Sequence, residues 1–369
     1  MTEHGKITAG QLTLLITNTV LASAILFAPS AIVKHAGTDA WLSLLIATLA
    51  GGMLALLAIH LCKLFPGATI FEFPELLLGK VLGKATAILY IWWNLHICAE
   101  VIHEFSFLMM TAFMPETPIL VFHLIMTAIA AYAVWHGLEV LARVAQLFVP
   151  FILISTLFLF VLAIPQMHMA HLFPIFDTDP LSILKGSAVP LSWFGEIMAF
   201  TAVLPFLNNR AESSTRSVLF GIFLVFLFFL ITVVGVVALL GPVITAANLL
   251  PLLTGARLIH ISTFVERVDP VLVIVIVLGG FLKISLFYWV AAFGSGQIAG
   301  LRDYRPIVVP VGFFLFVLSM SLHESPADLL DFLGTIWPVY AIGIFEAGIP
   351  VVLLAVGIYR AARGRGDSQ

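Results

Sequence analysis

Long apolar runs are the feature that most limits what this chain can fold into. An α-helix needs roughly 20 residues to cross the ~30 Å hydrocarbon core of a bilayer. Hydrophobic residues make up 61% of the 369 residues and charged residues only 10%, and a soluble protein of this size cannot bury so large an apolar fraction. The sequence predicts an all-α integral membrane protein with one membrane domain over residues 1–369. About ten runs have the required length, at 11–33, 41–62, 85–112, 118–135, 142–164, 187–206, 217–241, 270–299, 306–322 and 335–359.

The basic residues predict which way these helices face. With the N-terminus inside, the inner connections hold twelve of the 17 Lys and Arg residues, the outer connections hold four, and Lys283 lies within a run. Lys and Arg accumulate in the cytoplasmic loops of membrane proteins. Both termini are therefore expected in the cytoplasm, with a short tail at 360–369. In the long outer connection 242–269, the apolar segment 249–261 is either a short interfacial helix or a packed loop.

Composition and motifs exclude several classes of function. The formal net charge is −3, so no bulk attraction to nucleic acid is expected. Cys62 and Cys98 both lie in apolar runs and imply no disulfide framework. The sequence lacks a Gly-rich phosphate loop, a Cys/His metal-ligand spacing and a nucleophile elbow. We expect no enzymatic activity, no cofactor and no metal site.

Polar and helix-breaking residues interrupt two of the runs. The first contains Ala22-Ser23-Ala24-Ile25 and closes with Pro29, and the sixth contains Pro190, Ser192-Trp193-Phe194-Gly195-Glu196 and Pro205. Proline removes a helix hydrogen bond and glycine loosens the backbone. Transporters with inverted repeats bind ligands at such paired interruptions, although Pro and Gly also kink ordinary membrane helices. Runs one and six begin the two halves of a five-plus-five repeat, so a broken-helix binding site is predicted there.

Ionisable residues within the runs are the second group of candidates, because a charge at membrane depth needs a partner or a hydrated cavity. Lys283 lies near the middle of run eight, with Gly279 and Gly280 one turn earlier. It either acts as a fixed cation in place of a coupling Na⁺, exchanges a proton with a carboxyl such as Glu196, or forms a static ion pair that fixes helix packing. The other buried candidates are Glu346 in run ten and His96, Glu100, His103 and Glu104 in run three, of which His96, Glu100 and His103 share one helical face.

Six strings resemble the B subunit of the nutrient germinant receptors of endospore-forming bacteria. In chain order they are HAGTDAWLS from His35, EVLARVAQLFVP from Glu139, SWFGEIMAFTAVLPFLN from Ser192, VERVD from Val265, GGFLKISLF from Gly279 and LRDYRPIVVP from Leu301. The likeness runs from about Ile7 to the end of run ten. That family is grouped with the amino acid–polyamine–organocation transporters.

The resemblance implies the fold of the bacterial leucine transporter, a five-plus-five inverted repeat with helices one and six broken. The repeats would span about 11–164 and 187–359. It also implies a subunit of the spore inner membrane that recognises an amino-acid-like germinant, together with an A subunit and a C-subunit lipoprotein. The ligand would lie at Ala22, Ser23, Ala24 and Ile25 and at Ser192, Phe194, Gly195 and Glu196. The superfamily's first break is usually glycine-rich, whereas Ala22 and Ala24 flank Ser23 here, which predicts a narrower pocket or less unwinding of the helix.

Three functions are compatible with these observations. The first is a germinant-sensing receptor subunit built on a transporter scaffold. The second is a proton-coupled amino acid transporter that uses Lys283 and Glu196. The third is a pore or assembly component with a vestigial pocket. Sensing needs only unequal ligand affinity for two conformations, whereas transport also needs two gates that open in turn. A small zwitterionic or uncharged ligand is expected because the runs hold no cluster of one charge sign.

Overall fold

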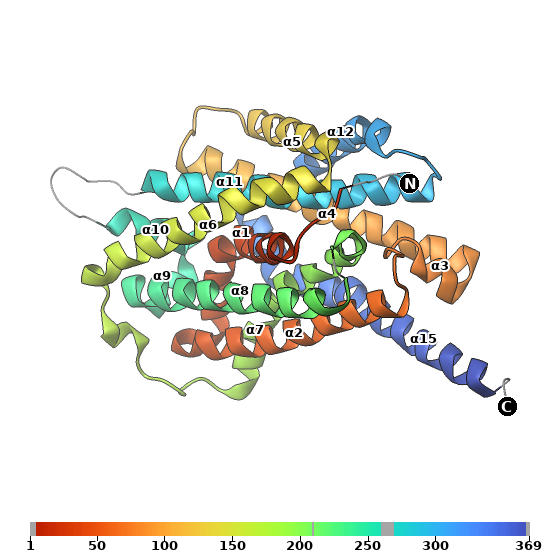
Figure 1. Cartoon of the computed structure of the whole chain (residues 1–369). Coiled ribbons are helices and arrows are strands. Elements are labelled where there is room, and N and C mark those ends of the chain that lie inside the picture. The colour runs from red at the N-terminus through yellow and green to blue at the C-terminus, as the bar shows by residue number, and fades with distance from the viewer. Residues whose placement is uncertain (1–4, 209, 260–268, 367–369) are drawn as a thin grey trace.

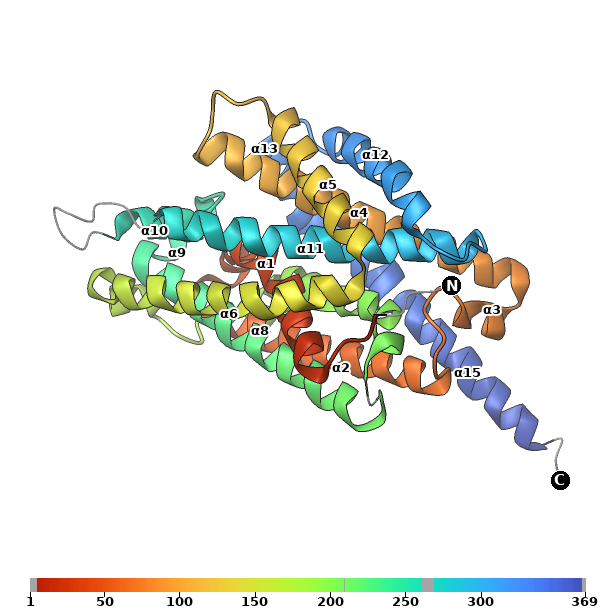
Figure 2. The same cartoon turned by 45° about the horizontal axis from the view of Figure 1, so that its top comes forward.

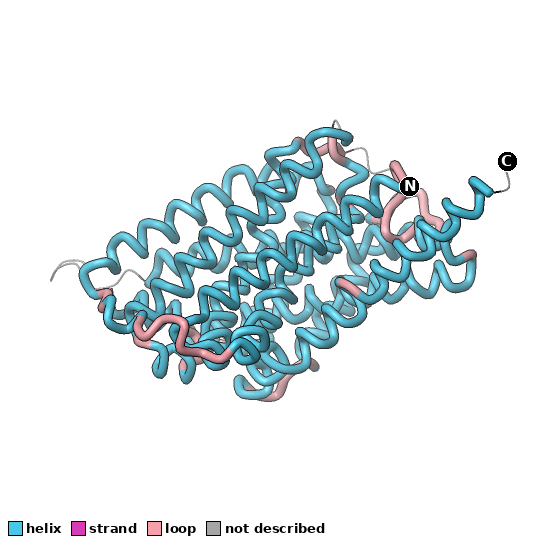
Figure 3. Tube along the Cα trace, turned by 90° about the horizontal axis from the view of Figure 1, so that it is seen from below, coloured by secondary structure: helices cyan, strands magenta, loops and turns pink. Residues whose placement is uncertain are grey.

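Helices make up almost the whole of the structure, a computed structural model that describes residues 5–208, 210–259 and 269–366 (Figure 3). Most loops lie at the two ends of the molecule. Among the described residues there is one isolated β-bridge, which joins Ile7 to Leu207. Residues 265–268 of the string VERVD and the last two residues of the segment 249–261 lie outside the described ranges.

All ten predicted runs coincide with a helix or a group of helical segments in the described part of the chain. The first half consists of α1 (Ala9–Ala36), α2 (Ala40–Leu64), α3 (Phe73–Leu78), α4 (Lys80–Ala112), α5 (Ile119–His136) and α6 (Leu138–Ala163). The second half consists of α7 (Pro180–Gly195), η4 (Glu196–Ala202), η5 (Leu204–Phe206), α8 (Arg210–Leu240), α9 (Pro242–Ala247), α10 (Pro251–Leu258), α11 (Asp269–Ile298) and α12 (Arg305–Ser321). The last run is a series of α- and π-helical segments, α13 (Pro326–Asp331), η6 (Phe332–Ile336), α14 (Trp337–Tyr340), η7 (Ala341–Glu346) and α15 (Gly348–Gly366). The short connecting segments are η1 (Gly37–Asp39), η2 (Ile164–Gln166) and η3 (Met169–Leu172).

Local sequence signals explain where several helices begin and end. Thr8 and Gln11 form a capping box at the start of α1, which satisfies backbone donors that have no partner within the helix. Asp179 accepts hydrogen bonds from two backbone amides of α7, whose first residue is Pro180. Between α5 and α6, Gly137 has a φ of +93°, a conformation that side chains with a Cβ rarely adopt.

Two groups of four helices pack side by side. The first group is α1, α2, α7 and α8, and the second is α4, α5, α11 and α12. In Figure 2, α5 and α12 lie on the side of α4 and α11 that faces away from α2. Contacts in one half have counterparts in the other, because α1 packs on α8 as α7 packs on α2, and α11 packs on α5 as α4 packs on α12. This arrangement confirms the predicted transporter-like fold and leaves an interface between the two groups.

Helix α1 lies near the middle of the bundle and contacts α6, α7, α8 and α11 (Figure 1). It runs without interruption from Ala9 to Ala36, so the predicted break at residues 22–25 is wrong. Alanine has the highest helix propensity, and this stretch contains no glycine to lower it. In a membrane an opened turn would also leave backbone groups without partners. The loss of one donor at Pro29 is tolerated within the helix.

The sixth run changes conformation where the sequence predicts. Helix α7 ends at Gly195, and the chain continues as the tighter 3₁₀ segments η4 and η5. The last run departs from α-helical geometry twice, at η6 and η7. Wide π turns inside helices are frequent at functional sites. The second of them, η7, ends at Glu346, next to the break in the sixth run.

The apolar segment that begins at Leu249 contains a helix, as the first of its two predicted forms requires. Helix α10 covers Pro251–Leu258, and Leu252 and Leu253 are buried against the bundle. Arg257 donates a hydrogen bond to the carbonyl oxygen of Ala112 at the end of α4 (2.9 Å). The helix therefore packs on the protein through its apolar side.

A buried carboxylate organises the loop that leads into α7. Asp39, at the end of η1, has no exposed surface. Its two oxygens accept hydrogen bonds from the backbone amides of Phe176, Asp177 and Thr178 at 2.6, 2.9 and 2.9 Å. These bonds satisfy three donors that a loop would otherwise leave open. Phe176 adopts a positive φ of 59°, which costs energy for a residue with a side chain and needs such support.

We predict that Asp39→Ala loosens this loop. The substitution leaves three backbone amides without their acceptor, and a hydrogen bond to a charged group contributes about 1.5–3 kcal/mol. Amide hydrogen exchange at residues 176–178 should accelerate by at least about tenfold. Asp177→Ala, which removes an exposed carboxylate from the same loop, is the matched control and should leave these rates unchanged. Equal protection in both variants would contradict the assigned role.

Candidate functional site

The centre of the molecule holds a buried ion pair between the two helix groups. Lys283 of α11 and Glu196 of η4 have side-chain exposures of 0% and 2%, and the lysine Nζ lies 2.8 Å from each carboxylate oxygen. Two charges at this depth persist because each neutralises the other. The pair therefore joins the group containing α11 to the group containing the broken sixth run.

Ser23 of α1 completes the surroundings of the lysine. Its hydroxyl oxygen accepts a hydrogen bond from Lys283 Nζ (3.0 Å) and another from the indole nitrogen of Trp193 (3.0 Å). Trp193 lies about one turn before Glu196 in the sixth run, so both side chains reach the same centre. Three segments, α1, α11 and the break after α7, thus meet at the ammonium group of Lys283.

Glu346 lies directly against that break. It has no exposed surface, and neither carboxyl oxygen has a hydrogen-bond partner among the described residues. A Cβ added to Gly195 would lie 1.9 Å from Oε2 of Glu346, so only glycine fits there. The turn that carries Glu346 is held by Tyr90, whose hydroxyl donates to the carbonyl oxygen of Phe345 (2.8 Å). An unpartnered buried carboxyl in native protein calls for a functional explanation.

Helices α1 and α11 approach closely beside the ion pair. The side-chain amide of Asn18 donates to the carbonyl oxygen of Gly279 (3.0 Å), and a Cβ on Gly279 would lie 3.5 Å from that of Ala22. Glu104 of α4 is buried, lies within electrostatic reach of Lys283 and has one carboxyl oxygen, Oε2, with no hydrogen-bond partner among the described residues. The centre therefore combines one ammonium group with three buried carboxyl groups.

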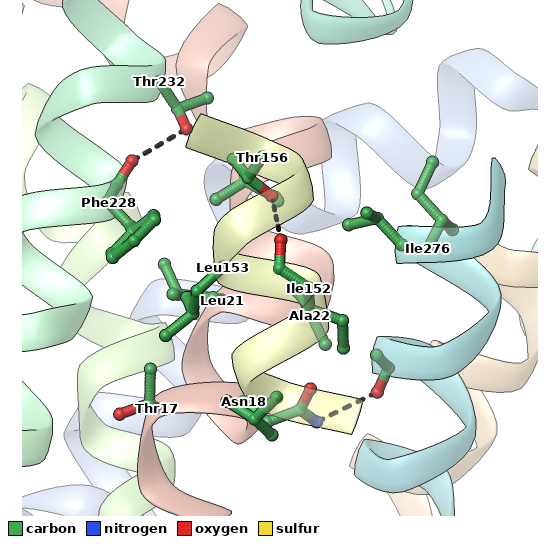
Figure 4. Close-up of a pocket in the computed structure, with 14 residues that line it drawn as sticks. Thr17, Asn18, Leu21, Ala22, Ile152, Leu153, Thr156, Phe228, Thr232 and Ile276 are labelled. Carbon is green, nitrogen blue, oxygen red and sulfur yellow. Dashed lines mark hydrogen bonds between the residues drawn. The ribbon is translucent and has the colours of Figure 1, made fainter. Parts of the chain in front are cut away.

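A small cavity lies next to this close approach of α1 and α11. Figure 4 shows this cavity, between α1, α6, α8 and α11, with Thr17, Ala22, Thr156 and Thr232 among its lining residues. The hydroxyls of Thr156 and Thr232 donate to carbonyl oxygens of their own helices. The cavity measures about 20 Å³, close to the minimum that one water molecule needs. It is too small for an amino acid in this conformation.

The predicted ligand residues are therefore divided between several environments. Ser23, Gly195 and Glu196 meet at the ion pair, whereas Ala22 and Ile25 line the small cavity between α1, α6, α8 and α11. The other three predicted ligand residues lie elsewhere. Ala24 is fully buried in the core. Ser192 donates to the carbonyl oxygen of Val189, in its own helix, at 2.8 Å. Phe194 packs on α2, since a Cβ on Gly51 would lie 2.5 Å from its Cβ.

The remaining ionisable candidates form a second cluster on α4. His96 Nε2 lies 3.5 Å from Oε1 of Glu100. Both carboxylate oxygens of Glu100 lie within 3.0 Å of Nε2 of His323, in the connection between α12 and α13. Burial opposes the charged form of His323, but its hydrogen bond to the Glu100 carboxylate and the charges of Glu100 and Asp328 outweigh this effect and raise the pKa of His323. Glu100 thus pairs with histidines rather than with Lys283.

Sequence reasoning missed three side chains of these clusters. Trp193 was visible as a polar aromatic residue three positions before Glu196. His123 and His323 are isolated histidines in separate runs, and no spacing rule relates them to α4. Only the packing of α5 and α12 on α4 brings them to His103 and Glu100.

We predict strong coupling between Lys283 and Glu196 in stability. Lys283→Met leaves Glu196 buried without its partner, which typically costs about 3–5 kcal/mol. Adding Glu196→Leu removes the unpaired charge, so the double variant should recover most of the loss. Thermal unfolding of the purified protein in detergent measures both changes. Additive losses from the two substitutions would contradict a tight pair.

We also predict that Gly195→Ala destabilises the protein through Glu346. The added methyl overlaps the carboxyl group, and such overpacking costs about 1–3 kcal/mol. Glu346→Ala in the same chain should restore most of this stability because the clash disappears. Gly334→Ala is the control, since a Cβ there meets nothing within 4 Å. The same unfolding measurement decides, and a failure of rescue would show that the methyl clashes elsewhere.

Known proteins resemble this chain along its whole length. The sequence pattern of the family described as "Spore germination protein" matches residues 6–327. Spore germination protein KB of Bacillus subtilis (strain 168) is 25% identical over 98% of this chain and 97% of its own length. Spore germination protein YndE of the same organism is 23% identical over 96% of this chain and 97% of its own length.

The fold also resembles that of a solved transporter. A Na⁺-coupled sialic acid symporter, in a substrate-bound outward-open state, superposes with a TM-score of 0.64 at 12% sequence identity. The match covers 92% of this chain and 79% of the symporter. At this identity the likeness concerns the fold alone, and it agrees with the two helix groups described above. The family match over residues 6–327 shows that the chain belongs to the spore germination protein family.

Proposed function

We propose that this chain is the germinant-sensing membrane subunit of a spore nutrient receptor and that it binds a small amino-acid-like ligand between its two helix groups. Family membership and the transporter-like fold support a ligand-binding, permease-like subunit. The binding residues are Ser23, Gly195, Glu196 and Lys283, with Glu346 beside them. Ala22 and Ile25 would contribute from the small cavity between α1, α6, α8 and α11.

The Lys283–Glu196 pair is the observation that carries this proposal. It presents an ammonium group and a carboxylate 2.8 Å apart, at the point where the two helix groups meet. A free amino acid carries the same two charges. Its carboxylate complements Lys283 and its ammonium group complements Glu196 or Glu346. A zwitterion can therefore replace the internal pair without leaving a charge unpaired.

Such a replacement gives a physical route from binding to signalling. Lys283 belongs to α11 and Glu196 to the broken sixth run, so the direct pair holds the two groups together. A ligand inserted between them keeps both charges neutralised but sets the groups further apart. Binding then favours a different arrangement of the groups, which is all that a sensor requires. In this structure the pair is closed and no room for an amino acid is left between its charges.

Orientation and partners follow from the sequence and the resemblance. We place both termini in the cytoplasm of the bacterial spore, with the chain in the inner membrane among its lipids. Figure 1 supports a common side for the termini, because the N- and C-terminal ends lie at the same end of the bundle. The A subunit and the C-subunit lipoprotein would receive the change in helix arrangement.

Proton-coupled amino acid transport is the alternative function. The symporter-like fold and the buried lysine–glutamate pair favour it, because a carboxyl that gains and loses a proton can drive a transport cycle. Uptake of a panel of labelled amino acids by the purified protein in liposomes, with and without a pH gradient, separates the two. Saturable binding without accumulation supports the sensor, and gradient-driven accumulation supports the transporter. Absence of binding across the panel would contradict both.

We predict that Ser23→Ala weakens binding of the amino acid that the panel identifies. The substitution removes the hydroxyl that orients Lys283, and a hydrogen bond to a charged group is worth about 1.5–3 kcal/mol, or roughly ten- to hundredfold in affinity. Ser192→Ala is the matched control, because that buried hydroxyl bonds only within its own helix. Equal affinities for both variants would remove Ser23 from the site.

A further inference from the structure

Four side chains from three parts of the chain form a buried histidine cluster, which we define as Glu100, His103, His123 and His323. Glu100 and His103 lie on α4, His123 on α5 and His323 between α12 and α13. The ring of His103 lies 5.4 Å from that of His123 and 5.3 Å from that of His323, measured between centroids. The proposed function gives these residues no role.

Hydrogen-bond partners settle where protons can reside in the cluster. The ring of His103 contacts the carbonyl oxygen of Ser319 through Nδ1 (3.0 Å). A carbonyl only accepts, so Nδ1 carries the hydrogen and Nε2 is free to accept a proton. His323 has a carboxylate at each ring nitrogen, Glu100 at Nε2 (2.9 Å) and Asp328 at Nδ1 (3.5 Å). Two carboxylates favour the doubly protonated, cationic ring.

His123 is the least satisfied member of the cluster. It is 1% exposed, and neither ring nitrogen has a hydrogen-bond partner among the described residues. Burying an imidazole without partners costs free energy, whereas a leucine at this position would cost none. Its position beside His103 supplies a reason for keeping a group that can accept a proton.

The cluster connects to solvent at one end and to the ion pair at the other. The Asp328 side chain is 54% exposed while that of His323 is 3% exposed, so Asp328 is the contact with solution. On the inner side, Glu104 lies one helical turn after Glu100, where side chains are neighbours. Glu104 is within electrostatic reach of Lys283, Glu196 and Glu100, and its Oε2 is unpartnered among the described residues.

We propose that this cluster carries protons between the solution at Asp328 and the Lys283–Glu196 pair. A proton taken up at Asp328 and His323 passes to Glu100, then by way of His103 to Glu104, and reaches the carboxylate of Glu196. Each relay group returns to its starting state, and one proton has moved from solution to Glu196. The neutral carboxyl no longer holds Lys283 by charge, so the link between the helix groups weakens.

The titratable and charged groups around this route come from several elements. They are Tyr90, His96, Glu100, His103 and Glu104 on α4, His123 on α5, His323, Glu324 and Asp328 around the start of α13, Tyr340 on α14, Glu196 on η4, Lys283 on α11 and Glu346 on η7. Lys283 is the one Lys or Arg in this set, so carboxyls and imidazoles provide the route.

Only one part of this inference rests on the proposed function, namely that acid entering at Asp328 acts on the same Lys283–Glu196 pair as the ligand. Its test uses protons as the probe. Infrared difference spectra of the full chain in liposomes, recorded after a jump from about pH 8 to about pH 5, follow the band of protonated carboxyls. The bands of Glu104 and Glu196 are identified by their loss in Glu104→Gln and Glu196→Gln.

We expect the bands of Glu104 and Glu196 to appear in the native chain and to form at least about tenfold more slowly in His323→Gln and His103→Phe. Glutamine at position 323 keeps a hydrogen bond to Glu100 but cannot ionise, so slow protonation there is not a folding defect. His136→Gln is the matched control, because His136 lies at the opposite end of α5 from His123. The proposal is overturned if no such bands form, or if they form equally fast in all these variants. Failure to bind any amino acid would leave this result intact and would count against the ligand proposal alone.

Discussion

The cost of placing a charge inside a membrane determines the arrangement of this protein. Lys283 is fully buried, and an unpaired ammonium group at that depth is costly. Lys283 of α11 needs a carboxylate partner, and Glu196 at the break of the sixth run provides it. Lys283 also donates to the hydroxyl oxygen of Ser23, which places α1 at the same point. One electrostatic need thus fixes how two groups of helices meet. Because the bond joins separate groups, its strength also sets how easily they move apart.

Periodicity and apolar length predicted most of the fold. Each predicted run corresponds to a helix or to a series of helical segments, and Gly195 marks the end of α7 as its sequence indicates. The first run shows the limit of such reasoning, because Pro29 suggests a break and yet α1 is continuous. A lone proline removes one donor, whereas opening a helix in lipid exposes several groups at once. The end of α7 is better marked by Gly195, which must be glycine because Glu346 packs against it. The sequence shows the glycine but not that Glu346 is its neighbour.

Sequence spacing also predicted the site only in part, for a geometric reason. Ala22 and Ser23 are adjacent in sequence but about 100° apart around a helix, since one turn takes 3.6 residues. A continuous α1 therefore turns Ala22 toward Gly279 and the small cavity, and Ser23 toward Trp193 and Lys283. An unwound segment would have allowed neighbouring residues to face one pocket. The same helical spacing correctly predicted that His96, Glu100 and His103 share one face of α4. The positions of His123 and His323 beside that face depend on how other segments pack on α4, which spacing does not predict.

A ligand and a proton act on the same bond by different means. A zwitterion replaces the Lys283–Glu196 contact with two new ion pairs, whereas a proton on Glu196 removes one of its charges. The first separates the helix groups with every charge matched, and the second leaves Lys283 to the remaining carboxyls, Glu104 and Glu346. Because both events change one equilibrium between closed and separated groups, each must alter the affinity for the other by the same factor. A proton that occupies Glu196 also deprives the ligand's ammonium group of its partner. Acid therefore loosens the Lys283–Glu196 pair and at the same time weakens ligand binding. The proton and the ligand both favour separated helix groups, but they compete for the carboxylate of Glu196.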